Sequence, residues 1–204
     1  MARDLTVLTI ADCHGTLTEK KLYRRIKNKT VDAVFFLGDN YPNDVETVIR
    51  LVPTYVPKLG VVGNHDGEDY LTRFGVLDLH GKTTSLFGYT IGGFGGCAKY
   101  RITKKRIMYT NKQSERILRK MPACDILLTH DRPRFQRFFM GDADGDICGV
   151  HSGLTGIGEF LKQHHPRYLF FGHYHVRLLL YYRHTQMRCC FRAEICHIKR
   201  KGEK

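Results

Sequence analysis

The sequence predicts an α/β fold in which polar side chains gather at one edge of a sheet. Apolar runs typical of buried strands alternate with segments of helical spacing, and the strand-like runs end in short motifs of Gly, Asp, Asn and His. No window of the chain is long and apolar enough to span a bilayer. The 204 residues, 42% of them hydrophobic, allow a substantial core. We therefore expect a single domain over residues 1–198, followed by a basic tail over 199–204.

The first part of the chain repeats one pattern, a strand that ends in a polar motif. We expect strands over 5–11, 31–37 and 55–62, and helices over 18–27 and 44–51. The motifs that follow the three strands are Asp12-Cys13-His14, Gly38-Asp39-Asn40 and Gly63-Asn64-His65-Asp66. Strand ends at the edge of such a sheet are places where sites are built.

After about residue 75 the predicted strands become short, at 82–86 and 89–91, and a glycine-rich stretch follows at 92–96. That stretch is either a loop whose backbone approaches a phosphate or a tight, mobile connection. The remaining predicted elements are a helix over 111–121, a strand over 125–129 ending at His130, a helix over 153–163, a strand over 168–171 ending at Gly172-His173-Tyr174-His175, and a hairpin over 176–198 with Cys189 and Cys190 in the core.

The segment 131–152 is too long for a simple connector, and loops of that length are often functional. Asp142, Asp144 and Asp146 resemble the start of a calcium-binding loop, but the twelfth position is Gly153 where such loops have Glu. We therefore interpret these carboxylates as a solvated acidic loop.

Cysteine spacing and net charge restrict the cellular compartment and the binding partners that we expect. The seven cysteines include no C-x-x-C pair, so neither a disulfide framework nor a zinc ribbon is indicated, and we expect a reduced, cytoplasmic location. The apolar run that starts at Leu5 is too short for a signal peptide. A net charge of +13, with a basic C-terminal end, favours polyanions including nucleic acid, although a solubilising surface would have the same composition.

Five predicted strands in succession along the chain end in polar residues. Together these residues offer oxygen and imidazole groups without thiolates. Such groups suit divalent ions such as Mn, Fe, Ni or Zn. Two ions need about seven or eight ligand positions with one shared carboxylate, and the strand ends supply that number. Glycines before Asp39, Asn64 and His173 let the backbone turn sharply, so that the side chains can converge.

These motifs resemble those of the calcineurin-like metallophosphoesterases, whose order is D-x-H, G-D, G-N-H-D/E, H and G-H-x-H. The resemblance runs from Asp12 to His175 and implies a two-sheet β-sandwich flanked by helices. It also implies two divalent metal ions, with Mn as first choice and Fe, Ni, Zn or Mg as alternatives. The implied ligands are Asp12, His14, Asp39 and His175 for the first metal, and Asp39 as the bridge with Asn64, His130 and His173 for the second.

The resemblance further implies a catalytic role for His65, which would meet the substrate phosphate and protonate the leaving group while Asp66 orients it. The implied reaction is in-line attack on phosphorus by a metal-bridging hydroxide. Besides Asn64 and His65, we expect Asn40 and His151 to contact substrate. Cys13 lies between two of the implied ligands, and we expect it to pack instead of acting in redox control.

Differences from the family pattern narrow the choice of subgroup within that family. Protein Ser/Thr phosphatases continue from Gly-Asp into a D-R-G segment, whereas Asp39 is followed by Asn40-Tyr41-Pro42-Asn43, and Asp66 stands in place of Glu. The chain is more similar to small bacterial and phage-type phosphoesterases that act on phosphomonoesters, phosphodiesters or both. Two alternatives remain. One is a nuclease, suggested by the basic balance and by Arg132, Arg134 and Arg137, and the other is a non-catalytic interaction module of the same fold. The oligomeric state is left open.

Overall fold

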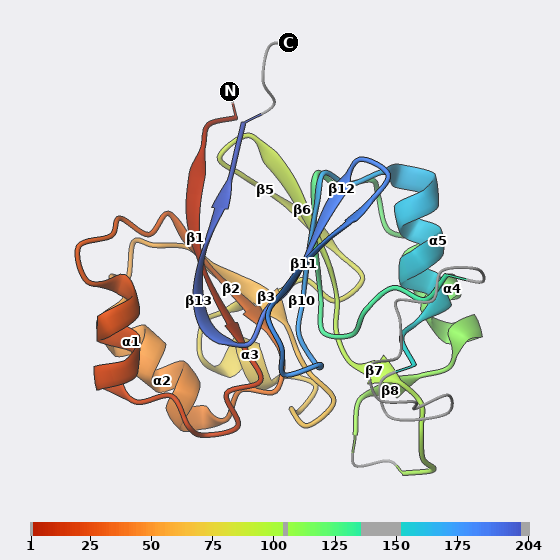
Figure 1. The fold of residues 1–204 in the computed structure, drawn as a ribbon. Coiled ribbons are helices and arrows are strands. Elements are labelled where there is room, and N and C mark those ends of the chain that lie inside the picture. The colour runs from red at the N-terminus through yellow and green to blue at the C-terminus, as the bar shows by residue number, and fades with distance from the viewer. Residues whose placement is uncertain (1, 104–105, 136–151, 201–204) are drawn as a thin grey trace.

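Two large β-sheets pack face to face, with helices on the outer face of each, in the computed structural model of the chain (Figure 1). The structure describes residues 2–103, 106–135 and 152–200. This architecture confirms both the α/β class and the two-sheet sandwich flanked by helices.

The first sheet has the strand order β13-β1-β2-β3-β4. Its strands are β1 (Leu5–Ala11), β2 (Ala33–Leu37), β3 (Lys58–Val61), β4 (Leu77–Asp78) and β13 (Arg192–Ile198). Strands β1 to β4 are parallel, and β13 pairs antiparallel with β1 along its whole length. Because the parallel strands run in one direction, the segments that follow β1, β2 and β3 meet at one edge of the sheet.

The second sheet has the order β11-β12-β10-β9-β6-β5. Its strands are β5 (Thr83–Leu86), β6 (Tyr89–Phe94), β9 (Ile126–Thr129), β10 (Tyr168–Phe171), β11 (Leu178–Tyr182) and β12 (Thr185–Cys189). Its four central strands are parallel, so His130 and Gly172 follow neighbouring strand ends. A small third sheet pairs β7 (Cys97–Ala98) with β8 (Met108–Tyr109).

Helices α1 (Glu19–Ile26) and α2 (Pro42–Leu51) lie beside the first sheet, and α4 (Asn111–Leu118) and α5 (Thr155–His164) lie beside the second (Figure 1). A short helix, α3 (Tyr70–Arg73), precedes β4. Thr18 caps α1 by accepting a hydrogen bond from the Lys21 N–H, and a capping box of Thr110 and Gln113 starts α4. Both caps satisfy backbone donors that the first helical turn leaves open.

Three apolar layers hold this arrangement together. The middle layer lies between the sheets, where the rings of Phe35 and Phe170 meet edge to face at 5.8 Å. One outer layer packs α1 and α2 on the first sheet, and the other packs α4 and α5 on the second. Burial of these side chains is the main favourable term in folding, and it fixes the sheet edge that carries the polar motifs.

Two expectations are corrected by the structure. Gly92 and Gly93 belong to β6 and form no phosphate-binding loop; a Cβ at Gly93 would lie 2.7 Å from atoms of Leu79 and Val61, so the glycine permits close packing between strands. The hairpin expected over 176–198 comprises only β11 and β12, because β13 leaves for the first sheet. The expected core positions of Cys189 and Cys190 are confirmed by exposures of 1% and 0%.

Candidate metal centre

All seven predicted ligand residues lie at adjoining strand ends, and the structure groups six of them into two clusters. We call Asp39, His130 and His173 the buried cluster, and Asp12, His14 and His175 the exposed cluster. Within each cluster the nitrogen and oxygen atoms lie within 4.8 Å of one another. His14 and Asp39 also form a third group with His65, which links the two clusters.

The backbone at these positions adopts a conformation that most residues avoid. Five of the seven residues have positive φ, between 45° and 70°: Asp12, His14, Asp39, His173 and His175. Each such residue costs on the order of 1–3 kcal/mol and persists only where the surrounding fold enforces it. Strain concentrated on converging polar side chains indicates that the positions serve a site and not the stability of the fold.

The buried cluster brings lone pairs together without donors between them. The Nδ1 atom of His130 lies 2.8 Å from the Leu37 carbonyl oxygen, which can only accept, so Nδ1 carries the proton. Burial lowers the pKa of His130 to about 4, which keeps the ring neutral. Its Nε2 therefore presents a lone pair to Asn64 Oδ1 at 3.0 Å and to Asp39 Oδ2 at 3.6 Å. Three acceptors facing one another are what a cation site requires.

The exposed cluster has the same chemistry with access to solvent. The ring nitrogens His14 Nε2 and His175 Nε2 lie 3.3 Å apart, and His175 Nε2 lies 3.7 Å from Asp12 Oδ1. Asp12 Oδ1 is buried and has no hydrogen-bond partner among the described residues, whereas Oδ2 accepts from the His173 N–H at 2.8 Å. Burial, and next the charge of Asp39, raise the pKa of Asp12 well above its ordinary value. A divalent cation would satisfy the orphaned oxygen and favour the charged carboxylate.

Asp39 joins the two clusters. Its Oδ2 atom lies 3.9 Å from His14 Nε2 and 3.6 Å from His130 Nε2, and its Oδ1 accepts from the His65 N–H at 2.7 Å. Burial raises the pKa of Asp39, but the neighbouring His130, the hydrogen bond from the His65 N–H, and the His65 and His14 rings together outweigh it and hold the pKa below the ordinary value. A Cβ at Gly63 would collide with the Asp39 carboxylate, so only glycine allows this approach.

His65 lies over this centre, with its Nε2 3.9 Å from Asp39 Oδ2 and its ring 5.3 Å from that of His14. Its side chain is 32% exposed, so a substrate can reach it. Burial lowers the pKa of His65, and Asp39 only partly opposes this effect.

Two of the expected site residues have other contacts than those predicted. Asp66 accepts hydrogen bonds from the backbone N–H groups of Gly63 and Asp39, at 2.7 and 2.9 Å, and no bond joins it to the His65 ring among the described residues. The expected orienting contact is thus replaced by a clamp between two ligand-bearing loops. Burial, and next Asp39, raise the pKa of Asp66 to about 7.

Asn40 is 1% exposed and does not face a substrate. Its amide nitrogen donates to the Ile10 and Gly38 carbonyls, and its Oδ1 accepts from the Cys13 N–H. The amide is fully engaged by backbone groups, so the prediction of substrate contact is wrong, and Asn40 instead fixes the loops after β1 and β2. His151 lies outside the described residues. Cys13 packs as expected: it is 1% exposed, and burial raises the pKa of its thiol.

Sequence reasoning missed two arginines beside the centre. Arg101 and Arg106 line a cavity of about 450 Å³ together with His65. The Nη1 atom of Arg106 is buried and has no hydrogen-bond partner among the described residues. The concentration of basic residues between 99 and 106, directly after the glycine-rich stretch, is the signal that could have identified them.

The predicted arginine loop and the basic C-terminal end differ in their surroundings. The guanidinium of Arg132 lies over the ring of Tyr174 at 4.9 Å, Arg134 is exposed, and Arg137 is outside the described residues. At the C-terminal end, Lys199 Nζ pairs with the Asp4 carboxylate at 2.9 Å. No helix in the described part of the chain is long and apolar enough to cross a membrane.

Comparison with known proteins identifies this arrangement. Residues 5–177 match the family model of the calcineurin-like phosphoesterases. A Thermus thermophilus protein of known structure superimposes with a TM-score of 0.68 at 16% identity, covering 92% of this chain and 89% of that one. The phosphopantetheinyl hydrolase of Mycobacterium tuberculosis gives 0.59 at 10% identity, covering 94% and 91%. These two likenesses concern the fold, and no curated protein sequence matches significantly. The match over most of its length shows that the chain belongs to the calcineurin-like phosphoesterases, a family of metal-dependent enzymes.

Proposed function

We propose that the protein is a dinuclear metal-dependent hydrolase of phosphomonoesters or phosphodiesters. The observation that carries the proposal is the meeting of lone pairs from His130, Asn64 and Asp39 at 3.0 and 3.6 Å, without a donor between them. The orphaned, buried Oδ1 of Asp12 in the exposed cluster supports a second cation position.

The donor sets fit divalent ions of intermediate hardness. Asn64 and the buried cluster would hold one cation, the exposed cluster the other, and Asp39 would serve both. Imidazole and carboxylate donors without thiolate favour Mn, Fe, Ni or Zn, with Mg a weaker fit to this many imidazoles. Such cations supply Lewis acidity that activates water and offsets negative charge on a phosphoryl group.

The chain's own side chains would bind and orient the ester. Arg106 would pair with a phosphoryl oxygen near His65, because both side chains line the same cavity. His65 would donate from its ring to the leaving-group oxygen. Burial favours its neutral form, and the negative charge of a bound phosphate would raise the pKa again.

Hydrolysis and metal content together test the proposal. Purified protein incubated with Mn²⁺ should cleave nitrophenyl phosphate, its bis-ester or both, and elemental analysis should find close to two metal ions per chain. Protein that retains two metal ions and cleaves neither ester, nor any member of a metabolite and dinucleotide panel, would contradict it.

The acid role of His65 has a separate test. In His65→Ala, kcat should fall by roughly a hundredfold or more while metal content stays unchanged. Wild-type kcat should also decline as pH rises through the His65 pKa in the complex, because the donating form is lost, and the variant should lack this decline. The matched control is His184→Ala, an exposed histidine in the β11–β12 turn, which should behave as wild type. An unchanged pH profile in His65→Ala would rule the acid role out.

A nuclease is the second candidate, and one contact favours it. Arg132 lies over Tyr174, which sits between His173 and His175, so one cation of the predicted arginine loop lies beside the metal centre. Cleavage of single-stranded or duplex nucleic acid that weakens steeply with salt would support this candidate. An interaction module is disfavoured, since six donor residues and His65 form the candidate metal groups and Asn64 contacts His130 beside them.

A further inference from the structure

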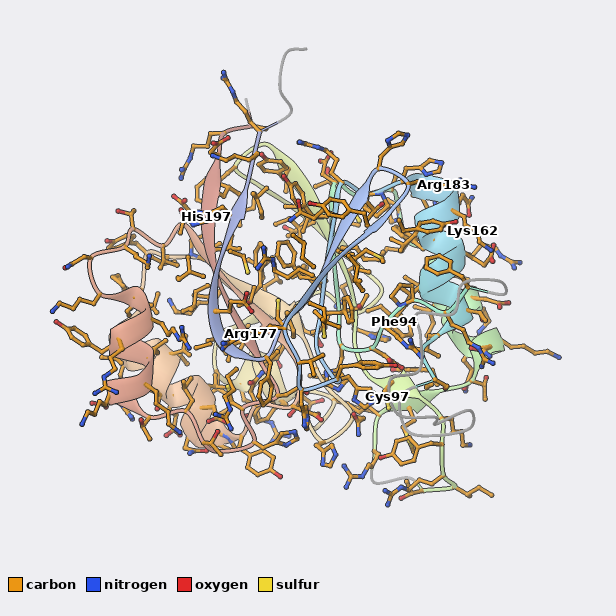
Figure 2. All side chains as sticks on the ribbon, in the orientation of Figure 1. Phe94, Cys97, Lys162, Arg177, Arg183 and His197 are labelled. Atoms are coloured by element: carbon orange, nitrogen blue, oxygen red, sulfur yellow. The ribbon has the colours of Figure 1, made fainter. Side chains whose placement is uncertain are left out.

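A cationic pocket adjoins the metal centre on the side of His175. It has a volume of about 760 Å³ and lies between α1 and the segments on either side of the β11–β12 hairpin. Five basic side chains line it: Lys21, Arg24, Arg25, Arg177 and Arg192. Apolar side chains such as Leu17 and Val176 line it too, and no carboxylate from the described part of the chain does. Arg177 is labelled in Figure 2 near the lower end of β13.

Few of these cations are neutralised within the protein. Arg24 and Arg25 are exposed on α1 and have no ion pair among the described residues. The Lys21 Nζ atom donates to the Thr16 carbonyl oxygen at 2.7 Å, and the Arg192 guanidinium lies over the Phe191 ring at 4.9 Å. Of the five, Arg177 is the one that forms an ion pair within the described residues, with Glu194 Oε2 at 3.4 Å. The pocket therefore keeps a strong positive potential, which concentrates anions.

The pocket adjoins the candidate metal centre, with which it shares His175. His175 of the exposed cluster lines it, as does Cys13, which stands between Asp12 and His14. The ring of Phe191, which also lines the pocket, stacks on that of His175 with centroids 5.4 Å apart and 20° between the ring planes. A molecule held at the metal centre beside His175 would therefore lie next to the pocket.

We propose that this pocket binds a second phosphoryl group of the substrate, so that the enzyme prefers small molecules carrying two or more phosphates to simple monoesters. This inference rests on the proposed function for the position of the first phosphate. A single space of this volume has the size of a small-ligand site, whereas a polymer needs a charged track along its length. Guanidinium groups bind phosphoryl oxygens in pairs of hydrogen bonds, which suits a terminal phosphate.

Binding of bisphosphonates tests the proposal without turnover. Bisphosphonates with methylene, propylene and pentylene linkers cannot be hydrolysed, and methylphosphonate is the comparison with one anionic group. Calorimetry on the protein as purified, with metal content measured before and after, should show one linker length binding at least roughly tenfold more tightly than methylphosphonate. Equal affinities across the series would overturn the proposal.

A double variant assigns that gain to the pocket. Arg24→Ala/Arg25→Ala should remove most of the bisphosphonate advantage, and it should lower the ratio of kcat/KM for a nucleoside bisphosphate to that for nitrophenyl phosphate by roughly tenfold. The matched control is Lys20→Ala/Lys112→Ala, which removes two exposed charges outside the pocket and should keep both ratios. Equal losses in the two double variants would show a general charge effect and overturn the proposal.

Two further outcomes distinguish a failure of the pocket proposal from a failure of the proposed function. Selective bisphosphonate binding that depends on Arg24 and Arg25, in a protein that hydrolyses no ester, would uphold the pocket and reject the proposed function. Loss of oligonucleotide cleavage in Arg24→Ala/Arg25→Ala, with bisphosphonate affinity unchanged, would overturn the small-molecule proposal in favour of a nucleic-acid track.

Discussion

The buried and exposed clusters have the same composition, one carboxylate and two imidazoles, and differ in contact with solvent. The side chains of His130 and Asp39 are 0% and 3% exposed, while those of His14 and His175 are 27% and 52% exposed. Electrostatic interactions strengthen where water is excluded. We therefore expect the buried cluster to hold its cation tightly and the exposed cluster to exchange its cation and receive the substrate.

The largest effect should come from the residue that both clusters share. In Asp39→Asn, kcat/KM should fall by roughly a thousandfold, because one substitution weakens both cation positions. Elemental analysis should find both metal equivalents reduced. Asp69→Asn, at an exposed carboxylate on the start of α3, serves as the control and should match wild type. If Asp39→Asn kept one full equivalent, the bridging role would be excluded.

Replacing one histidine of each cluster by alanine should change the stability of the metal-free protein to different extents. His130→Ala leaves a cavity and deprives the Leu37 carbonyl of its donor, so we expect a loss of about 2–4 kcal/mol in unfolding free energy. His14→Ala should change it by less than about 0.5 kcal/mol, since that ring is partly exposed. Urea unfolding of chelator-treated proteins measures the unfolding free energy of both variants. Equal losses of unfolding free energy would show that the two clusters do not differ in their contribution to stability.

Metal removal should proceed in two steps. On addition of a chelator, one equivalent should leave the exposed cluster first, and activity should be lost with it and return when Mn²⁺ is added. The second equivalent should leave more slowly, because its ligands are enclosed. Stopped time points analysed for metal content and activity check the order. Loss of both equivalents in one phase would show that burial does not distinguish them.

His80 offers a smaller comparison, a partly buried histidine outside the two clusters. Its Nδ1 accepts from the Gly95 N–H at 3.0 Å, and burial lowers its pKa. The unfolded chain then binds a proton below about pH 6.5 that the folded chain does not, so stability should fall as pH falls through that range. His80→Gln should reduce this slope of unfolding free energy against pH, whereas His184→Gln, at an exposed site, should retain it. Identical slopes in all three proteins would contradict the effect.

The donor set could be predicted from the sequence because each motif is local. The end of a strand places Asp12 and His14, or His173 and His175, at the sheet edge, whatever the distant parts of the chain do. The roles of Asp66 and Asn40 could not be predicted, since their partners are backbone groups of other loops. Arg106 depends on the small β7–β8 sheet, whose two-residue strands leave no periodic signal.

The secondary-structure elements also divide into those that the local sequence predicts and those that depend on distant parts of the chain. The alternating strands and helices follow from local periodicity, so β1, β2, β9 and β10 agree with expectation to within a few residues. Gly92 and Gly93 resemble loop residues in sequence, yet both belong to β6, where Leu79 and Val61 leave no room for a Cβ at Gly93. The direction taken by β13 is set by pairing across the whole chain and has no local signature.

The pairing of β1 with β13 has a consequence for how the protein is made. Residues 5–11 hydrogen-bond with residues 192–198, so a nascent chain carries β1 with one edge open until residues 192–198 have been made. Asp12 and His14 follow that strand directly. A nascent chain therefore completes the candidate metal centre late, and translation pauses before residues 192–198 are made would prolong the time for which β1 is exposed to other chains.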